Sequence, residues 1–235
     1  MKKSSWKAVS NSKYNNLKYY IIISVIAFAV YANSLSNEFV FDDESVVLGD
    51  PSITNLENIP KYFTAREGFH KVIGRYYRPV VSASYALDYS VWGFKPFGFH
   101  LTNVIIHVIN CILFLKLLLL IFSPNSKFSI QNSQFKIHAP QFIILAGAVI
   151  FTVHPIHTEA VSWVSGRTDS LSFTFFIAAF IFYIKYSSSR GRLNFILTAL
   201  FFLFALLAKE MAITLPLTII LFDVLRITIN RDETI

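Results

Sequence analysis

Charged residues are scarce in this chain of 235 residues: Asp, Glu, Lys and Arg make up only 15% of it. A soluble domain usually carries about 25% charged residues, so the composition argues against a soluble globular protein. Hydrophobic residues make up 54% of the chain, and the mean hydropathy is +0.52. These residues fall into runs long enough to cross a bilayer. We therefore expect an integral membrane protein.

Cysteine is almost absent, and acidic residues (14) are fewer than basic ones (21). The single cysteine, Cys111, lies in an apolar run, which excludes an internal disulfide framework and a cysteine-based metal site. The net charge is +7, and the basic residues at or before the start of the first apolar run are Lys2, Lys3, Lys7, Lys13 and Lys18. A basic cluster beside a span is typical of a cytoplasmic flank rather than of a nucleic-acid site. No nucleic-acid partner is expected.

The apolar runs predict an all-α, multi-pass transmembrane helical bundle of about six spans, since helices satisfy their own backbone hydrogen bonds in lipid. The third run is short unless residues 154–161 continue it, and Pro216 inside the sixth predicts a kink. The predicted spans are residues 17–36, 99–122, 140–153, 171–186, 193–208 and 212–225.

Lys and Arg flank alternate ends of these spans, which places the N-terminus in the cytoplasm. The predicted organisation is a basic cytoplasmic segment (1–16), a membrane module (17–225) and a C-terminal tail (226–235). The long first loop, 37–98, is then extracytoplasmic. Its aromatic and apolar residues predict short amphipathic helices, one of them beginning at Pro79, because proline is favoured in the first turn of a helix.

Four polar residues form a stripe in the second span. They are spaced at i, i+3, i+7 and i+10, which places them on one helical face, and they are His100, Asn103, His107 and Asn110. Polar side chains within a span usually face the bundle interior or a wet cavity. Two interpretations stay open: hydrogen bonds that hold the helices together, or the lining of a binding site. The two histidines lie about 10 Å apart along the axis, which disfavours a shared metal ion.

Ionisable residues gather on the predicted extracytoplasmic side. The adjacent Asp42 and Asp43 follow the first span, where a carboxylate can act as a general base, although acidic residues also flank spans simply because they are soluble there. Basic side chains on the same side would stabilise a leaving phosphate. The dense segment between the third and fourth spans admits three interpretations: a phosphate site, zinc ligation or a structural cap. The ionisable residues beyond the acidic pair are Arg78, His154, His157, Glu159, Arg167, Asp169, Lys209 and Glu210.

Read in order, several strings resemble the transmembrane and tetratricopeptide-repeat (TPR) family of protein O-mannosyltransferases and its prokaryotic relatives. The resemblance covers about residues 20–225. The strings are Phe39-Val40-Phe41-Asp42-Asp43, Tyr77-Arg78-Pro79, Gly98-Phe99-His100-Leu101-Thr102-Asn103 with His107 and Asn110, His154-Pro155-Ile156-His157-Thr158-Glu159-Ala160-Val161, Ser165-Gly166-Arg167-Thr168-Asp169 and Ala208-Lys209-Glu210.

The resemblance implies a membrane glycosyltransferase of the GT-C type. Such an enzyme transfers a sugar, here mannose, from a polyprenyl- or dolichyl-phosphate donor to a Ser or Thr hydroxyl of an acceptor protein. It implies an inverting displacement on the extracytoplasmic face, in a prokaryotic cell membrane or in the endoplasmic reticulum, with no cofactor and no metal. Asp42 or Asp43 is then the catalytic base. The residues implied to line the donor phosphate and sugar are Arg78, His100, Asn103, His107, His154, His157, Glu159, Arg167, Asp169, Lys209 and Glu210.

One feature of the family does not occur in this sequence: there are no TPR repeats after the last predicted span. We therefore expect the chain to represent the front membrane portion of such an enzyme, and a truncated enzyme of this kind can be inactive. Two other functions stay open: a non-catalytic membrane scaffold, and a transporter or flippase for polyprenol-linked substrates. A flippase would carry charges near mid-membrane and related halves, whereas here the charges gather at one face.

Overall fold

The computed structural model of the protein describes residues 3–64, 76–122 and 141–231, with side chains from 17 onward and up to 225 within those ranges. These residues form helices and turns and no strand, which confirms the all-α prediction. Residues 125–134, whose polar sequence predicts a loose cytoplasmic connection, lie outside the described residues.

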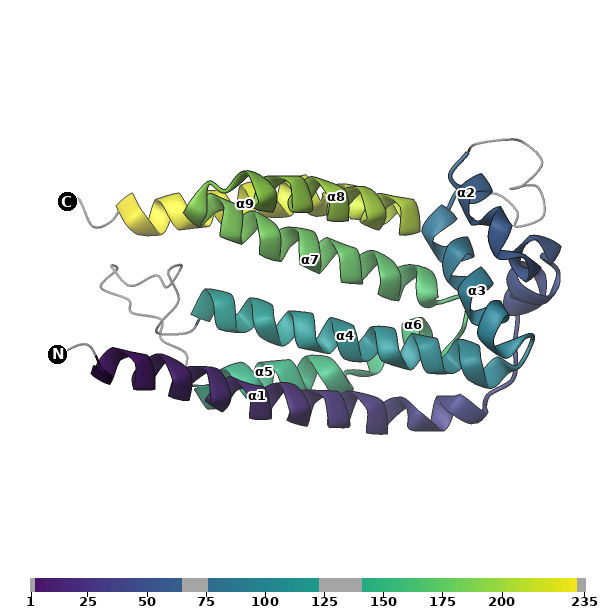
Figure 1. Ribbon diagram of the computed structural model, residues 1–235, viewed down its shortest axis with the longest axis horizontal. Coiled ribbons are helices and arrows are strands. Elements are labelled where there is room, and N and C mark those ends of the chain that lie inside the picture. The colour runs from purple at the N-terminus through teal and green to yellow at the C-terminus, as the bar shows by residue number, and fades with distance from the viewer. Residues whose placement is uncertain (1–2, 65–75, 123–140, 232–235) are drawn as a thin grey trace.

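Six helices build the bundle, and they run along its long axis (Figure 1). They are α1 (Lys3–Tyr31), α4 (Pro96–Phe122), α5 (Gln141–Val153), α7 (Arg167–Ser189), α8 (Arg192–Ala208) and α9 (Leu215–Arg231). The start of α1 and the end of α9 lie at the same end of the bundle. Helix α1 begins at Lys3, so it includes most of the basic segment predicted for residues 1–16. Helix α9 ends at Arg231, past the boundary predicted at residue 225.

Short helices cover the opposite end, called here the capped end (Figure 1). The short helices expected in the first loop are present, and α3 begins at Pro79 as predicted. The short elements are η1 (Ala32–Ser36), η2 (Glu44–Leu48), η3 (Pro51–Thr54), η4 (Leu56–Asn58), α2 (Ile59–Tyr62), α3 (Pro79–Trp92), η5 (Pro155–His157), α6 (Thr158–Ser162) and η6 (Glu210–Thr214).

Three helical segments within the described ranges are long and apolar enough to cross a membrane: Leu17–Ser36, Pro96–Phe122 and Arg167–Ser189. A fourth span results if Gln141–Val153 and Pro155–Ser162 are counted together across their 41° bend. The prediction of about six spans is therefore confirmed only in part. Helices α8 and α9 have 17 residues each and extend only about 26 Å, which is shorter than the hydrocarbon layer of about 30 Å.

Two prolines explain local geometry in these helices. Pro155 removes a backbone donor and forces the preceding His154 into an extended conformation (φ −66°, ψ 130°), so the third predicted span bends there. Pro216, predicted to kink the sixth span, instead occupies the first turn of α9. Proline is tolerated at that position because the N–H that it lacks would have no partner within the helix.

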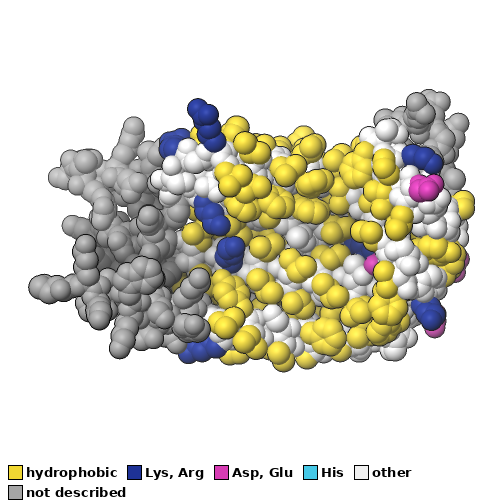
Figure 2. Space-filling view, viewed as in Figure 1, with side chains coloured by type: hydrophobic (Ala, Val, Ile, Leu, Met, Phe, Trp, Pro, Cys, Tyr) yellow, Lys and Arg dark blue, Asp and Glu magenta, His cyan; other side chains and the backbone are white. Residues whose placement is uncertain are grey.

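Hydrophobic side chains form both the core and the outer surface. At the capped end, Tyr62, Tyr85 and Phe99 belong to one buried cluster that packs α2 and α3 onto α4. Outward-facing residues such as Val25 (62% exposed) and Leu217 (68% exposed) suit contact with lipid. In Figure 2 hydrophobic side chains cover most of the visible bundle, and Asp and Glu gather at the capped end.

We predict that Gly98→Ala destabilises the corner between α3 and α4. A Cβ atom at Gly98 would lie 2.1 Å from Cγ of Trp92, and overpacking of this kind costs about 1–3 kcal/mol. Gly147→Ala is the matched control, because the nearest atom to its added Cβ would be 3.7 Å away, at Leu118. Thermal unfolding in detergent measures both; equal midpoints for the two variants would contradict the prediction.

Candidate active site

A cavity of about 520 Å³ lies at the capped end, and we call it the outer cavity. Five ionisable residues that line it come from five separate parts of the chain: Asp42 after η1, Arg78 before α3, Glu159 in α6, Asp169 in α7 and Lys209 after α8. The structure thus brings together five of the predicted site residues. Ser165, Trp163 and Tyr85 also line the cavity, although none was predicted.

The two adjacent aspartates have different environments. Asp43 is fully buried, and its carboxylate accepts hydrogen bonds from the backbone N of Ser165 (2.8 Å), the Ser165 hydroxyl (2.5 Å) and the backbone N of Val40 (3.1 Å). Asp42 is exposed and faces the outer cavity. Asp43 therefore ties the loop after α1 to the loop before α7, and the Asp42 carboxylate is the one available for chemistry.

The two cations of the outer cavity are held in ion pairs. Arg78 donates through Nη2 to both carboxylate oxygens of Glu210 (3.1 and 3.2 Å), and Lys209 Nζ lies 2.6 Å from Oδ1 of Asp169. A backbone hydrogen bond at its own residue and the nearby Arg78 lower the pKa of Glu210. Glu210 and Asp169 are 62% and 54% exposed, and exposed pairs are worth only about 0–1 kcal/mol. Neither ion pair therefore holds its cation strongly.

Arg167 was predicted to bind the donor, but the structure places it elsewhere. Its side chain is fully buried, does not line the outer cavity, and uses its donors inside the protein. The guanidinium donates to Asn103 Oδ1 (2.7 Å), Phe99 O (2.8 Å) and Ser84 Oγ (3.2 Å), pairs with Asp88 at 2.6 Å and lies over the Tyr85 ring at 4.8 Å. Arg167 therefore joins α3, α4 and α7, which is a structural role.

Asp88 is the partner that sequence reasoning missed. It lies in α3 and is only 6% exposed. Burial raises the pKa of its carboxyl, while the Arg167 guanidinium and the Thr102 hydroxyl, which donates to it at 2.6 Å, oppose that shift. The signal in the sequence was the one charged residue of a helix whose other residues are apolar or neutral, and a buried charge of this kind needs a partner.

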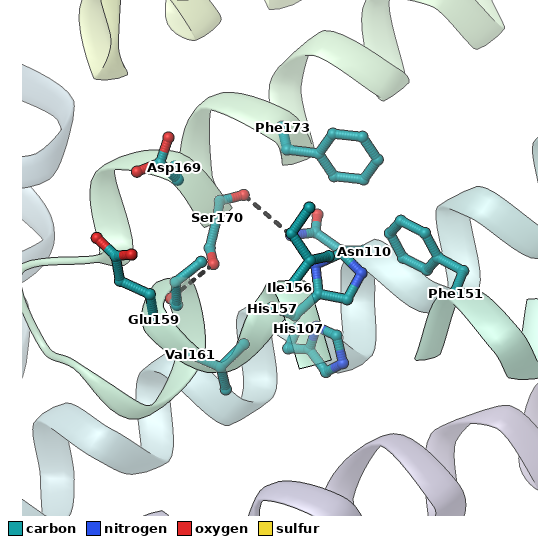
Figure 3. Close-up of a pocket in the computed structure, with 11 residues that line it drawn as sticks. His107, Asn110, Phe151, Ile156, His157, Glu159, Val161, Asp169, Ser170 and Phe173 are labelled. Atoms are coloured by element: carbon teal, nitrogen blue, oxygen red, sulfur yellow. Dashed lines mark hydrogen bonds between the residues drawn. The ribbon is translucent and has the colours of Figure 1, made fainter. Parts of the chain in front are cut away.

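A second cavity of about 380 Å³, called here the inner chamber, is lined by residues of α4, α5, α6 and α7. It is lined by His107 and Asn110 of α4, by His157, and by the aromatic rings of Phe151 and Phe173 (Figure 3). Its rim shares two carboxylate residues, Glu159 and Asp169, with the outer cavity. The two cavities therefore adjoin.

The polar stripe of α4 is fully buried, as its spacing predicted. Asn103 has a structural role, because its amide donates to Val161 O (3.2 Å) and Trp163 O (2.8 Å). His107 bonds to Thr152 O (3.1 Å) and Asn110 donates to Ser170 O (3.0 Å), yet both also line the inner chamber. Hydrogen bonding between helices therefore explains Asn103, whereas His107 and Asn110 combine such bonds with the lining of a cavity.

Two histidines predicted to bind the donor line neither the outer cavity nor the inner chamber. His100 is fully buried in α4, and neither of its ring nitrogens has a hydrogen-bond partner among the described residues. His154 is exposed and caps η5, because its Nδ1 accepts a hydrogen bond from the backbone N of Ile156 (3.2 Å). In the described part of the chain, no three His, Cys, Asp or Glu side chains are grouped to hold a metal ion.

A smaller pocket of about 320 Å³, the side pocket, lies beside the outer cavity. Val40, Phe41 and Trp163 give it apolar walls, and it shares Asp42 and Glu159 with the outer cavity. Phe41 is 85% exposed and has a positive φ of 53°, a turn conformation uncommon for an aromatic residue. This turn directs the chain so that Asp43 points inward and Asp42 toward the cavities.

These features define a helical membrane protein with a cavity at one end of its bundle that is lined by an exposed carboxylate and two basic side chains. The chain is a homologue of the TMTC protein O-mannosyl-transferases over most of its length, which confirms the resemblance seen in its motifs. No protein-family model and no solved structure matches it.

Three curated relatives illustrate the homology. Protein O-mannosyl-transferase TMTC3 of Mus musculus is 34% identical over 208 residues, 83% of this chain and 20% of the relative. TMTC3 of Homo sapiens is 33% identical over 213 residues (85% and 21%), and Tmtc1 of Drosophila melanogaster is 32% identical over 211 residues (86% and 22%). The chain thus spans about a fifth of the length of these relatives.

We predict that Arg167→Met lowers the free energy of unfolding by about 3–5 kcal/mol, because removing one partner leaves a buried charge without compensation. The double variant Arg167→Met/Asp88→Asn should recover part of that loss, since it removes the stranded carboxylate while keeping an acceptor for Thr102. Denaturant titration followed by circular dichroism measures both. A double variant less stable than Arg167→Met would contradict the assignment.

Proposed function

We propose that the chain forms the sugar-transfer centre of an inverting membrane glycosyltransferase of the GT-C type. The donor is a polyprenyl-phosphate sugar, with mannose as the sugar, and the acceptor is a Ser or Thr hydroxyl of a protein on the extracytoplasmic face. One observation carries the proposal: the exposed Asp42 carboxylate shares a single cavity with Arg78 and Lys209. The homology to protein O-mannosyl-transferases supports the choice of sugar and acceptor.

Asp42 acts as the general base in this mechanism. It accepts the proton of the acceptor hydroxyl as that oxygen forms a bond to the anomeric carbon of the sugar. The bond from the anomeric carbon to the phosphate oxygen breaks at the same time, and its electron pair leaves with the polyprenyl phosphate. A single displacement from the opposite face inverts the anomeric centre. Asp42 borders both the outer cavity and the side pocket, so an acceptor in the side pocket has the base beside it.

Arg78 and Lys209 stabilise the leaving phosphate. Both side chains are partly exposed, at 21% and 24%, and both line the outer cavity. Negative charge on the phosphate increases as the glycosidic bond breaks, and preorganised cations then contribute more than in the ground state. Their present partners, Glu210 and Asp169, keep the side chains oriented until the donor binds.

The predicted topology completes the proposal. The basic start of α1 lies in the cytoplasm, so the capped end faces the extracytoplasmic side. Helices α8 and α9 complete the bundle beside α7 (Figure 1), and the apolar outer surface accommodates the lipid tail of the donor. A non-catalytic scaffold is the competing function; it requires no free carboxylate in the cavity.

We predict that Asp42→Asn lowers the rate of sugar transfer by about 10²–10⁴-fold, the usual contribution of a general base, while the thermal midpoint stays close to that of the wild type. Asp43→Asn should instead lower the midpoint, because it weakens the bonds to Ser165 and Val40. Glu57→Gln, an exposed acid on η4, is the control. The measurement is transfer of radiolabelled mannose from polyprenyl phosphate to a Ser/Thr peptide. Transfer that survives Asp42→Asn would contradict the role of Asp42 as the base, and a wild-type protein that transfers no mannose would favour a scaffold.

We predict that Lys209→Met raises the KM for the donor and lowers kcat by about tenfold or more, since it removes a cation from the developing phosphate charge. The matched control is Lys95→Met, because Lys95 is an exposed lysine at the capped end that does not line the outer cavity. Steady-state kinetics with varied donor separates the two constants. A Lys209→Met enzyme whose donor kinetics equal those of Lys95→Met would remove Lys209 from the phosphate site.

A further inference from the structure

The inner chamber has no role in the chemistry derived above. We propose that it receives the sugar ring of the lipid-linked donor, a hexosyl group, and that His157 and Glu159 recognise its hydroxyls. This inference rests on the proposed function, because it assigns one part of that donor to one part of the cavity. It adds a specificity site within the bundle, separate from the base and from the phosphate-binding cations.

The position of the chamber fits this occupant. Glu159 and Asp169 border both cavities, and Asp169 also pairs with Lys209. A phosphate held at Lys209 therefore lies beside the opening of the inner chamber. The group attached directly to that phosphate, the sugar, is the part of the donor that can enter. The volume of about 380 Å³ lies in the usual range for small-ligand sites, roughly 300–1,000 Å³.

Two polar groups at the chamber lack partners within the described residues. Nε2 of His157 is buried and makes no hydrogen bond there. The Glu159 side chain is exposed, borders the chamber and has no hydrogen bond or ion pair within the described residues. A buried polar atom left without a partner costs about 1–3 kcal/mol. Sugar hydroxyls both donate and accept hydrogen bonds, so they can satisfy the imidazole and the carboxylate together.

The other polar groups of the chamber are already bonded, which confines recognition to a few atoms. Asn110 donates to Ser170 O (3.0 Å) and accepts from the Thr174 hydroxyl (2.7 Å). The Ser170 hydroxyl donates to Ala160 O (2.9 Å). His107 already bonds to Thr152 O. These bonds fix the shape of the chamber and leave His157 and Glu159 to contact the ligand.

Aromatic rings form the opposite wall. In Figure 3, Glu159 and Asp169 lie on one side of the chamber and Phe151 and Phe173 on the other. Phe151 stacks on Phe114 (centroids 4.2 Å apart) and lies 5.7 Å from Phe173 and 4.5 Å from the His157 ring. A hexose has polar edges and C–H-rich faces, and the negative face of an aromatic ring attracts such weakly positive hydrogens. The chamber therefore offers a polar wall to the edges of the sugar and an aromatic wall to its faces.

An isoprenoid tail is the alternative occupant, and the chemistry of the chamber disfavours it. A tail would cover the buried Nε2 of His157 and take the Glu159 carboxylate out of water without offering either a hydrogen bond, which is costly for polar groups. The exposed apolar helices of the bundle already offer the tail a place beside lipid. The chamber is therefore better suited to the polar end of the donor.

The test compares two ligands on the purified full-length protein in detergent: mannosyl-phosphoryl-polyprenol and the same polyprenyl phosphate without sugar. The variants are His157→Phe, which keeps a ring but removes the nitrogens, and Glu159→Gln, which keeps the shape at an exposed position. His154→Asn is the matched control, because His154 lies outside the chamber and asparagine preserves its cap. Trp163, which lines the outer cavity, reports binding by fluorescence.

We expect each chamber variant to weaken binding of the mannosyl lipid by about tenfold, the effect of losing one good hydrogen bond. Binding of the sugar-free phosphate should stay within about twofold for His157→Phe, and should stay equal or become tighter for Glu159→Gln, which removes a negative charge near the phosphate. His154→Asn should match the wild type with both ligands.

Different results separate the failure of this inference from the failure of the proposed function. If a chamber variant weakens both lipids equally, the chamber holds the tail or the phosphate, and the sugar assignment is wrong. If neither variant changes binding of the mannosyl lipid, the assignment is also wrong, while the base and phosphate roles stand. If the wild type binds neither lipid, the proposed function itself fails, and the sugar assignment fails with it.

Discussion

The buried guanidinium of Arg167 is the interaction on which the rest of the site depends. It pairs with Asp88 of α3 and donates to Asn103 and to Phe99 O of α4, from its own position at the start of α7. A cation this far from water is tolerated only with a charged partner and full hydrogen bonding. The same contacts hold α3 across the bundle end, which places Arg78 at the outer cavity.

Neighbouring residues in the motifs divide structural and cavity-facing roles. Asp43 ties two loops together while Asp42 faces the cavity. His154 caps a short helix while His157 lines the inner chamber. Lys209 lines the outer cavity while Glu210 pairs with Arg78 beside it. Side chains close together on a turning backbone point in different directions, so one member of each pair can anchor the segment that presents the other. A motif of this kind therefore contains fewer ligand-binding groups than ionisable residues.

Much of the fold was predictable, because hydrophobic runs and proline positions act locally. The spans at 17–36 and 99–122 and the helix that begins at Pro79 agree with the described helices. The sequence left open whether residues 154–161 continue the third span, and the structure shows that the chain bends at His154, before Pro155. The lengths of α8 and α9 lie near the limit for a span, where composition alone does not settle how a helix sits in lipid.

For the candidate site, the sequence by itself determined which residue types gather at one end of the bundle and that the polar stripe of α4 faces inward. Helical periodicity and the charge bias of the loops are sufficient for that much. Only the tertiary structure decided that Arg167 is buried against Asp88 while Arg78 and Lys209 reach the cavity. Which charge is buried depends on which partner lies opposite it after the helices pack. Asp88 and Arg167 are 79 residues apart in the chain, a pairing that no local pattern encodes.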